Sequence, residues 1–281
     1  MAAKLLCILL LLSFSAGLSA QPADSTAVYG DSIAVLQPLP DLPDGLQRIW
    51  RDATNAVYYL DKSGTLYKQD AASTFVFADT RLGTLTDLDV SNPFGLLAWF
   101  ADYQLIVLLD RTLHERGRLD LREIDATSNT SLVARSADDR IWVYDEYEFR
   151  LRLLDQSGRE QLRSDDLRQL LRITESPLAI LPAEGAVFVY FPTHGLVEFS
   201  RYGRYRATRP LPAADKFSWT GGELLLRSGN QLRRWRPISG LTDPLTISAE
   251  LLDAEWILPG PSRFLVSRRG KAYWWEQGLR E

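Results

Sequence analysis

The sequence has very few of the residues that build most metal and nucleophile sites. Cys7 is its only cysteine, and His114 and His194 are its only histidines. A structural zinc site needs about four ligands, mostly Cys and His, and a disulfide within the chain needs a second cysteine. A Cys- or His-rich metal site and an internal disulfide are therefore both excluded.

The chain also lacks an excess of positive charge. Its formal net charge is −4, whereas a nucleic-acid binder needs a strong basic surplus, so we expect no nucleic-acid partner. The charge is nevertheless uneven. Asp24–Asp110 holds twelve Asp and no Glu, and Arg201–Arg236 holds nine basic residues against Asp215 and Glu223. Either the solvated surface is simply uneven, or a partner carries the complementary charge, such as lipopolysaccharide or peptidoglycan for the basic stretch.

An apolar run near the N-terminus has the layout of a secretory signal. The run Leu5–Leu12 follows a positively charged start and precedes small residues, and it is too short to cross a membrane. We expect a signal peptide over residues 1–20, cleaved after Ala20 or Ser19, and no membrane span. The mature protein would lose Cys7 and would be held by its core alone, which favours a periplasmic or secreted location.

The rest of the chain has the length and composition of a single all-β domain. With 281 residues, 46% of them hydrophobic, the chain can bury a sizeable core. Residues 21–30 are expected to form a flexible tail and residues 31–281 one domain. Helix signals are scarce, and only Leu167–Ile173, after the capping sequence Ser164–Leu167, is expected to form one or two helical turns.

A repeat organises this domain. Leu96–Leu121 and Ile141–Leu162 share one pattern, in which two β runs meet at a polar tip and a third run follows. Six such hairpins recur at intervals of about 36–46 residues, a spacing typical of β-propeller blades. They begin near Val57, Leu96, Ile141, Val187, Glu223 and Phe264. A further β run precedes each hairpin: Leu46–Trp50, Leu85–Val90, Leu132–Arg135, Leu178–Leu181, Phe217–Thr220 and Leu251–Leu258.

The last repeat ends too early to contain its outermost strand. Only six residues follow Lys271–Trp275, whereas a spare strand at Asp31–Leu36 precedes the first repeat. We therefore expect a six-bladed propeller of four-stranded antiparallel blades, closed by an N-terminal strand in the last blade. Pro38, Pro40 and Pro43 are expected to form a stiff connector outside the sheet. Four tryptophans are expected to pack between blades: Trp142, Trp219, Trp256 and Trp274.

The turn sequences resemble those of a known superfamily. Tyr59–Thr65 and Leu153–Arg159 share a strand, D-x-x-G turn, strand pattern. This pattern resembles the six-bladed β-propeller superfamily that includes NHL-repeat and TolB-like proteins. The fourth repeat departs from it, because Ser200 stands in the place of the Asp. The resemblance implies a fold and no particular activity, since propellers host binding, scaffolding and catalysis.

The candidate binding residues lie at the polar tips of the hairpins. In a propeller the tips that join the second and third strands gather on one face, around the mouth of the channel. Mixed charge with exposed tyrosines suits contact with a protein or polymer. The predicted binding residues are Asp102, Tyr103, Asp145, Tyr147, His194, Asn230 and Arg268. We expect a monomeric, non-catalytic binding or scaffold module of the cell envelope, with an envelope protein or polymer as its partner.

Catalysis is the alternative, although no recognisable motif supports it. No G-x-S-x-G sequence is present, so the two histidines are expected to be turn or surface residues, and we expect no cofactor and no metal. A calcium-assisted hydrolase or lyase could instead use carboxylates in the central channel. Its candidate ligands would be Asp87, Asp89, Asn92, Asp138, Asp139 and Glu184.

The segment Ser91–Gly95 stands out because Asn92-Pro93 starts a stiff turn that presents Phe94. As a structural feature, it would be a corner with a buried ring. As a functional feature, Phe94 would be an aromatic anchor for a partner.

Overall fold

The computed structural model describes residues 34–277 apart from 40–44, 72, 125–128, 213, 221, 237–238, 241, 247–250, 252 and 261–262. The chain divides into two compact units, Met1–Asp31 and Ser32–Glu281, and every described residue belongs to the second. The predicted signal peptide (1–20) and tail (21–30), with Pro40 and Pro43, lie outside the described residues.

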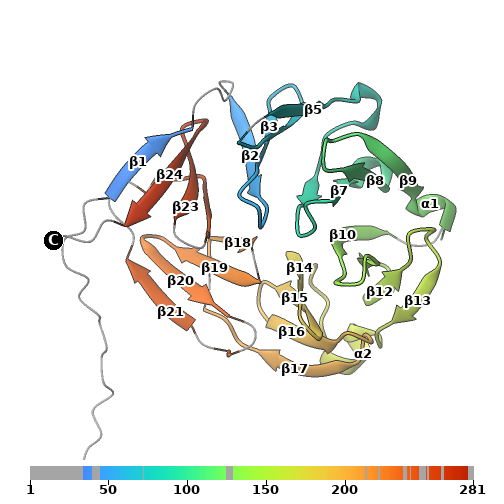
Figure 1. Ribbon diagram of the computed structural model, residues 1–281. Coiled ribbons are helices and arrows are strands. Elements are labelled where there is room, and N and C mark those ends of the chain that lie inside the picture. Colours follow the sequence, from blue (N-terminus) through green and yellow to red (C-terminus); the bar gives the residue numbers. More distant parts are fainter. Residues whose placement is uncertain are drawn as a thin grey trace, which may run out of the picture. The chain divides into compact units, whose positions relative to one another are not determined.

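Six four-stranded antiparallel sheets form the blades of a ring in the second unit (Figure 1). The fold is the predicted six-bladed β-propeller. The first three blades are β2 (Leu46–Arg51), β3 (Val57–Asp61), β4 (Leu66–Gln69) and β5 (Thr74–Phe77); β6 (Asp87–Asp89), β7 (Gly95–Phe100), β8 (Leu105–Asp110) and β9 (Glu115–Asp120); and β10 (Thr130–Arg135), β11 (Ile141–Asp145), β12 (Arg150–Leu154) and β13 (Glu160–Arg163).

The last three blades follow the same order from the innermost strand outward. They are β14 (Ala179–Ala183), β15 (Ala186–Phe191), β16 (Gly195–Ser200) and β17 (Tyr205–Arg209); β18 (Lys216–Thr220), β19 (Glu223–Ser228), β20 (Gln231–Trp235) and β21 (Thr242–Thr246); and β22 (Trp256–Leu258), β23 (Phe264–Arg268), β24 (Lys271–Gln277) and β1 (Ala34–Pro38). The hairpin starts predicted at Val57, Ile141, Glu223 and Phe264 are confirmed to the residue.

The N-terminal strand closes the last blade, as predicted. β1 pairs antiparallel with β24 from Ala34↔Gln277 to Pro38↔Tyr273, so strands from opposite ends of the chain share one sheet. The prediction that Pro38 lies outside the sheet is wrong. Pro38 is the last residue of an outermost strand, where a residue without an N–H can be accommodated because one side of the strand needs no ladder partner.

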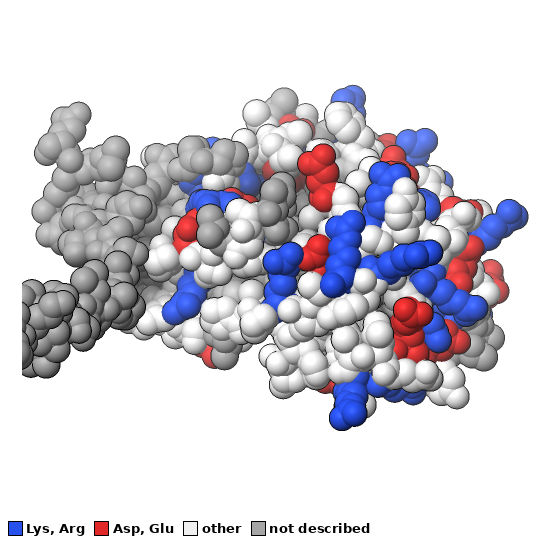
Figure 2. Space-filling model, turned by 90° about the horizontal axis from the view of Figure 1, so that it is seen from below, with Lys and Arg blue, Asp and Glu red and all other residues white. Residues whose placement is uncertain are grey.

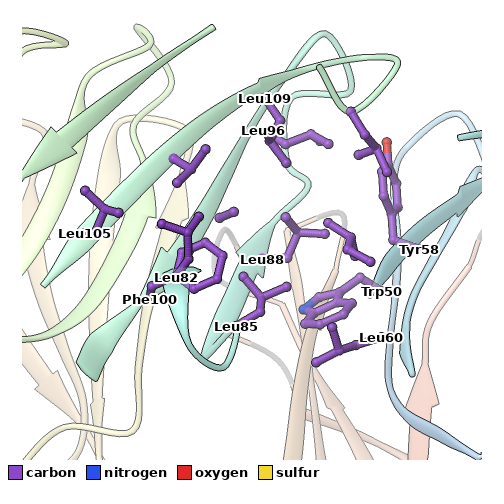
Figure 3. Packing of buried hydrophobic residues seen from close by; sticks show 14 of the residues in the cluster. Trp50, Tyr58, Leu60, Leu82, Leu85, Leu88, Leu96, Phe100, Leu105 and Leu109 are labelled. Carbon is purple, nitrogen blue, oxygen red and sulfur yellow. The ribbon is translucent and has the colours of Figure 1, made fainter. Parts of the chain in front are cut away.

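The middle strands of each blade are buried on both faces because a neighbouring blade covers each side. In β7, Leu96, Ala98 and Phe100 belong to a core shared with the first blade, whereas Leu97 and Trp99 belong to a core shared with the third. Figure 3 shows the first of these cores, with Trp50 and Tyr58 facing the side chains of β7. Alternate residues therefore serve two different cores, and the strand reads as one continuous apolar run.

The four predicted tryptophans do pack between blades. Trp142 is buried, with 3% of its surface exposed, in the core between the third and fourth blades. The other three tryptophans are half-buried. Trp219 packs against the core between the fourth and fifth blades, and Trp256 and Trp274 pack against the core between the sixth and first blades. Large flat side chains fill the widening space between twisted sheets.

One aspartate turn recurs at the ends of the hairpins. In the turn after β3, Asp61 Oδ1 accepts hydrogen bonds from Ser63 N (2.8 Å), Ser63 Oγ (2.6 Å) and Thr65 N (2.9 Å), while Gly64 has a φ of 81°. Asp52, Asp110 and Asp155 form the same turn. The side-chain oxygen replaces backbone partners that the turn leaves unpaired.

The variant turn of the fourth blade preserves this geometry with a hydroxyl. Ser200 Oγ accepts from Tyr202 N and Arg204 N, each at 3.3 Å, and Gly203 has a φ of 74°. The two bonds are longer than those of Asp61, and a neutral hydroxyl is a weaker acceptor than a carboxylate. The departure from the D-x-x-G pattern therefore changes the strength of the turn and not its shape.

Two short helices lie between blades. α2 (Leu167–Leu171) begins at the predicted residue, where the Asp166 side chain accepts from Arg168 N, and it ends two residues earlier than predicted. The helix α1 (Leu121–Ile124) was not predicted, since Leu121 had been assigned to the preceding strand. Asp120 Oδ1 accepts from Arg122 N and so starts a helical turn at the end of β9.

The closure of the last blade can be tested by truncation. A chain that begins at Leu39 lacks β1 and leaves β24 as an unpaired edge, whereas a chain that begins at Ser32 keeps the complete blade. We expect the shorter chain to melt at a temperature lower by about 5 °C or more, measured by circular dichroism. Equal melting temperatures for the two chains would contradict a closing role for β1.

The aspartate turn predicts a pH-dependent stability. Burial alone would raise the pKa of Asp61, but the hydrogen bonds from Ser63 and Thr65 outweigh it and lower the pKa below its usual value. This stabilisation is present above the unfolded-state pKa of about 3.9 and is lost as the pH falls through the lower folded-state pKa. We expect Asp61→Ala to lower the free energy of unfolding by about 1 kcal/mol at pH 7.

The matched control is Asp61→Asn, which keeps an acceptor oxygen but cannot be protonated. Urea unfolding at pH 7 and at decreasing pH would separate the two effects. The difference in the free energy of unfolding between wild type and Asp61→Asn should shrink as the pH falls. A difference that grows would refute the stabilising role of the ionised Asp61 carboxylate.

Candidate functional site

The inner strands of the six blades surround a cavity of about 880 Å³. Its volume lies in the range of about 300–1,000 Å³ typical of small-molecule sites. The lining comes from the first strand of every blade and the adjoining turns. It includes Arg48, Trp50, Arg51, Asp52, Asp87, Asp89, Ser91, Leu132, Val133, Ala134, Leu178, Ala179, Ile180, Leu181, Pro182, Asp215, Lys216, Phe217, Ser218, Trp219, Glu255 and Trp256.

The lining divides into two sectors of opposite character. The third and fourth blades contribute eight residues, all of them apolar, which we call the apolar sector: Leu132, Val133, Ala134, Leu178, Ala179, Ile180, Leu181 and Pro182. The other four blades contribute every charged residue of the lining, and we call this the polar sector. Its charged residues are Arg48, Arg51, Asp52, Asp87, Asp89, Asp215, Lys216 and Glu255.

Arg48 links the polar sector across neighbouring blades. Its guanidinium lies over the rings of Trp50 (5.0 Å) and Trp256 (5.2 Å), so it stacks on aromatic residues of two blades. It donates to Thr86 O at 2.7 Å and pairs with Asp87 Oδ1 at 2.8 Å, and Trp50 Nε1 donates to the same oxygen at 3.1 Å. These contacts join three consecutive blades of the ring, the sixth, the first and the second.

The carboxylates of the lining are engaged by the protein itself. Asp52 caps its own turn and accepts from the Tyr58 hydroxyl, while Asp89 accepts from the backbone N–H groups of Ser91 and Arg135. Asp215 and Glu255 accept from Gly229 N and Ser267 Oγ. No three His, Cys, Asp or Glu side chains in the described part of the chain are grouped as a metal site.

The candidate calcium ligands are dispersed over the molecule. Asp87 and Asp89 line the cavity, but Asp138 pairs with Arg140 in an exposed turn and Glu184 is exposed in another. Asn92 Nδ2 donates to Asp139 Oδ1 at 3.1 Å, and Arg135 pairs with the same oxygen at 2.9 Å. These bonds brace the turns of two neighbouring blades.

The seven predicted binding residues all lie at or beside turns between second and third strands, and the cavity lining includes none of them. Asp102, Tyr103 and Asn230 are exposed, and Tyr147 is 70% exposed. Arg268 pairs with Asp253, and His194 Nδ1 lies 2.5 Å from Glu175 Oε1. The binding role of these residues stays a prediction.

Asp145 does not present its carboxylate to solvent as expected. It is only 1% exposed, at the end of β11, and its Oδ2 lies 3.1 Å from the guanidinium of Arg152 on the neighbouring strand. Its Oδ1 accepts from the N–H groups of Tyr147 and Glu148. One carboxylate oxygen thus accepts from the backbone of the turn and the other faces a guanidinium, so the Asp145 side chain is buried in the turn and not presented on the surface.

Both histidines lie on outer turns, as expected. His114 is 80% exposed and its Nδ1 lies 2.8 Å from the hydroxyl of Thr112. His194 and Thr193 both bond to Glu175, and these bonds outweigh burial and lower the pKa of that carboxyl. Neither histidine lines the cavity.

Phe94 is 69% exposed, so the expectation of a buried ring is wrong. The corner itself is rigid, because Phe94 N donates to Asn92 Oδ1 at 3.0 Å and Gly95 N donates to Asn92 O at 3.1 Å. A constrained corner that holds an aromatic ring in solvent keeps the anchor interpretation open.

The basic stretch 201–236 is partly neutralised. Arg206 and Arg209 pair with Glu198, and Arg234 and Arg236 pair with Glu223. Figure 2 shows basic and acidic side chains interspersed over one side of the molecule rather than separated. These ion pairs count against the contact of this stretch with an anionic polymer. That contact stays a prediction.

Comparison with known proteins shows the fold and nothing narrower. No protein-family model matches the sequence, and no curated protein matches it. Virginiamycin B lyase from Staphylococcus aureus is a similar solved structure, with 13% identity, a TM-score of 0.57, and 84% of this chain and 82% of that chain covered.

Two further solved structures are similar. A streptogramin B lyase matches with 12% identity and a TM-score of 0.58, covering 86% of this chain and 97% of its own. The Pan2 WD40 domain from Neurospora crassa matches with 8% identity and a TM-score of 0.52, covering 88% and 95%. Together with the six sheets, these likenesses place the chain in the class of six-bladed β-propellers. In the part of the chain that the structure describes, no helix has the length and apolar character needed to cross a membrane.

The Arg48–Asp87 pair can be tested with a double-mutant cycle. We expect Arg48→Ala and Asp87→Ala to be coupled by roughly 0.5–1 kcal/mol in urea unfolding, since both side chains are only partly screened from solvent. Arg48→Lys should restore little of the loss, because an ammonium cannot stack flat between two indoles or bond in a fork. A coupling of zero, or full rescue by Lys, would show that this cluster does not hold the blades.

Proposed function

We propose that this protein is a secreted, non-catalytic binding module of the cell envelope that holds its ligand in the central cavity. The observation that carries the proposal is the cavity itself: it has the volume of a ligand site and an apolar sector open to its interior, while its carboxylates are bonded to the protein. A site built to bind needs shape, apolar surface and a few fixed polar groups.

The arrangement supports binding better than catalysis. The described lining contains no histidine and no cysteine, and each carboxylate already accepts a hydrogen bond from a neighbouring group. A general base or nucleophile must be free to reach a substrate atom. Two structures with a similar fold are named as lyases. At 12–13% identity, this likeness shows the fold alone and does not assign an activity to this chain.

The secreted location rests on the sequence. The apolar run Leu5–Leu12 has the layout of a signal, and the remaining 269 or so residues contain no cysteine, which suits a bacterial envelope protein without disulfides. The exposed tyrosines Tyr103 and Tyr147 would contact an envelope protein or polymer next to the channel, with the propeller acting as a monomer.

The proposal predicts that filling the cavity abolishes binding. Ala53 is exposed, lines the cavity and occupies the second position of the Asp52 turn, so Ala53→Trp should narrow the site without disturbing the core. After incubation with a small-molecule extract of cell envelopes and gel filtration, mass spectrometry should find a retained molecule on the wild type. The Ala53→Trp variant should lose at least about nine-tenths of it.

The matched control is Arg111→Trp, at the equivalent exposed position of the Asp110 turn and outside the cavity lining. It should retain the molecule like the wild type, and the retained molecule should have the same mass before and after incubation. Equal retention by both variants, or conversion of the molecule into a product, would overturn the proposal. A fall in melting temperature on addition of a chelator would favour the calcium-assisted alternative.

A further inference from the structure

The division of the cavity into two sectors narrows the chemistry of what it can hold. A purely polar ligand would leave the apolar sector exposed to water. A purely apolar ligand would remove water from the charged residues of the polar sector without replacing its hydrogen bonds. We propose that the ligand is an amphiphile, with an apolar body against the third and fourth blades and a neutral or cationic head against the others. This inference rests on the proposed function, because it names the ligand class of the same cavity.

Part of the apolar sector is available to a ligand, although Ala134, Ile180 and Leu181 are buried in the interblade cores. Leu178 is 43% exposed, and Leu132, Val133 and Ala179 are only half-buried. They come from adjacent blades, since β10 and β14 are the inner strands of the third and fourth. All four residues belong to the cavity lining, so an apolar group placed against them removes apolar surface from water.

The polar sector favours a cationic head over an anionic one. Its three basic residues face five acidic ones, which gives a formal charge of −2. Both arginines are already committed: Arg48 pairs with Asp87, and the guanidinium of Arg51 donates to Pro259 O at 2.5 Å and to Asn55 Oδ1 at 2.6 Å. Lys216 is the remaining cation, and its Nζ donates to Glu255 O at 3.2 Å.

Three of the five carboxylates are held by neutral donors in the described hydrogen bonds. Asp89, Asp215 and Glu255 accept from backbone N–H groups or a hydroxyl and not from a side-chain cation, whereas Asp87 pairs with Arg48 and Asp52 interacts with the charge of Arg51. Charges that line a cavity with low-dielectric walls raise the local concentration of the opposite sign. An ammonium head gains from this field, whereas a sulfate or carboxylate head is repelled.

The test uses N-phenyl-1-naphthylamine, a neutral apolar dye that becomes fluorescent when it leaves water. We expect the full chain to bind the dye. Decyltrimethylammonium and decyl sulfate share one apolar chain and differ in head charge, and both are used well below micelle formation. Decyltrimethylammonium should displace the dye at a concentration about tenfold lower than decyl sulfate.

Two variants locate the sectors. Leu178→Asp places a charge in the apolar sector and should weaken dye binding at least about tenfold, whereas Leu170→Asp, the same change at a position of matching exposure outside the lining, should leave it unchanged. Combining Asp215→Asn with Glu255→Gln keeps their acceptor oxygens and removes two charges. It should abolish the preference for the ammonium head.

Several results would overturn the inference: no dye binding by the wild type, equal displacement by the two detergents, or equal binding by Leu178→Asp and Leu170→Asp. These are separable from failure of the proposed function. If the dye does not bind but Ala53→Trp still loses a hydrophilic envelope molecule that the wild type retains, the cavity is a binding site and its ligand is not an amphiphile. If neither molecule binds, both proposals fall.

Discussion

Packing between blades is the constraint on which this structure depends. A four-stranded sheet in this ring has no core of its own, so each one buries its two faces against the sheets on either side. Leu96 and Leu97, neighbours in one strand, belong to different cores for this reason. Such a ring closes only when every blade has two neighbours, and the pairing of β1 with β24 completes one blade with strands from the two ends of the chain.

The same constraint explains why the cavity can differ from sector to sector. The second strands supply much of the interblade packing, and they are mostly apolar in every blade. The inner strands turn one backbone edge and part of their side chains toward the channel, where neighbouring blades do not dictate their composition. Some charged residues there bond to a neighbouring blade, as Arg48 does to Thr86 and Asp87. These polar contacts take the place of the apolar contacts made by the strands farther from the channel.

The sequence predicted the architecture well because period-two runs and turn residues are local signals. Hairpin starts such as Ile141 and Phe264 were found to the residue, and the missing last strand pointed to β1. The site was harder, since burial depends on partners that the local pattern does not show. Asp145 looked like a solvent-facing tip, but Arg152 of the next strand buries it, and Phe94 looked like a core ring but extends into solvent.

Most of the cavity lining was missed for a related reason, although a signal existed; of the candidate channel residues, only Asp87 and Asp89 line it. The run before each hairpin forms the innermost strand, so polar or aromatic residues in those runs, such as Arg48 and Trp256, mark the channel. Only the third and fourth blades contribute no charged residue to the lining, and the runs alone do not show this, since Leu132–Arg135 ends in Arg135 and Phe217–Thr220 has no charge. Repeats must be alike where they pack against one another, so positions at which the repeats differ are positions that packing does not constrain. Binding of a ligand in the cavity would account for such a difference.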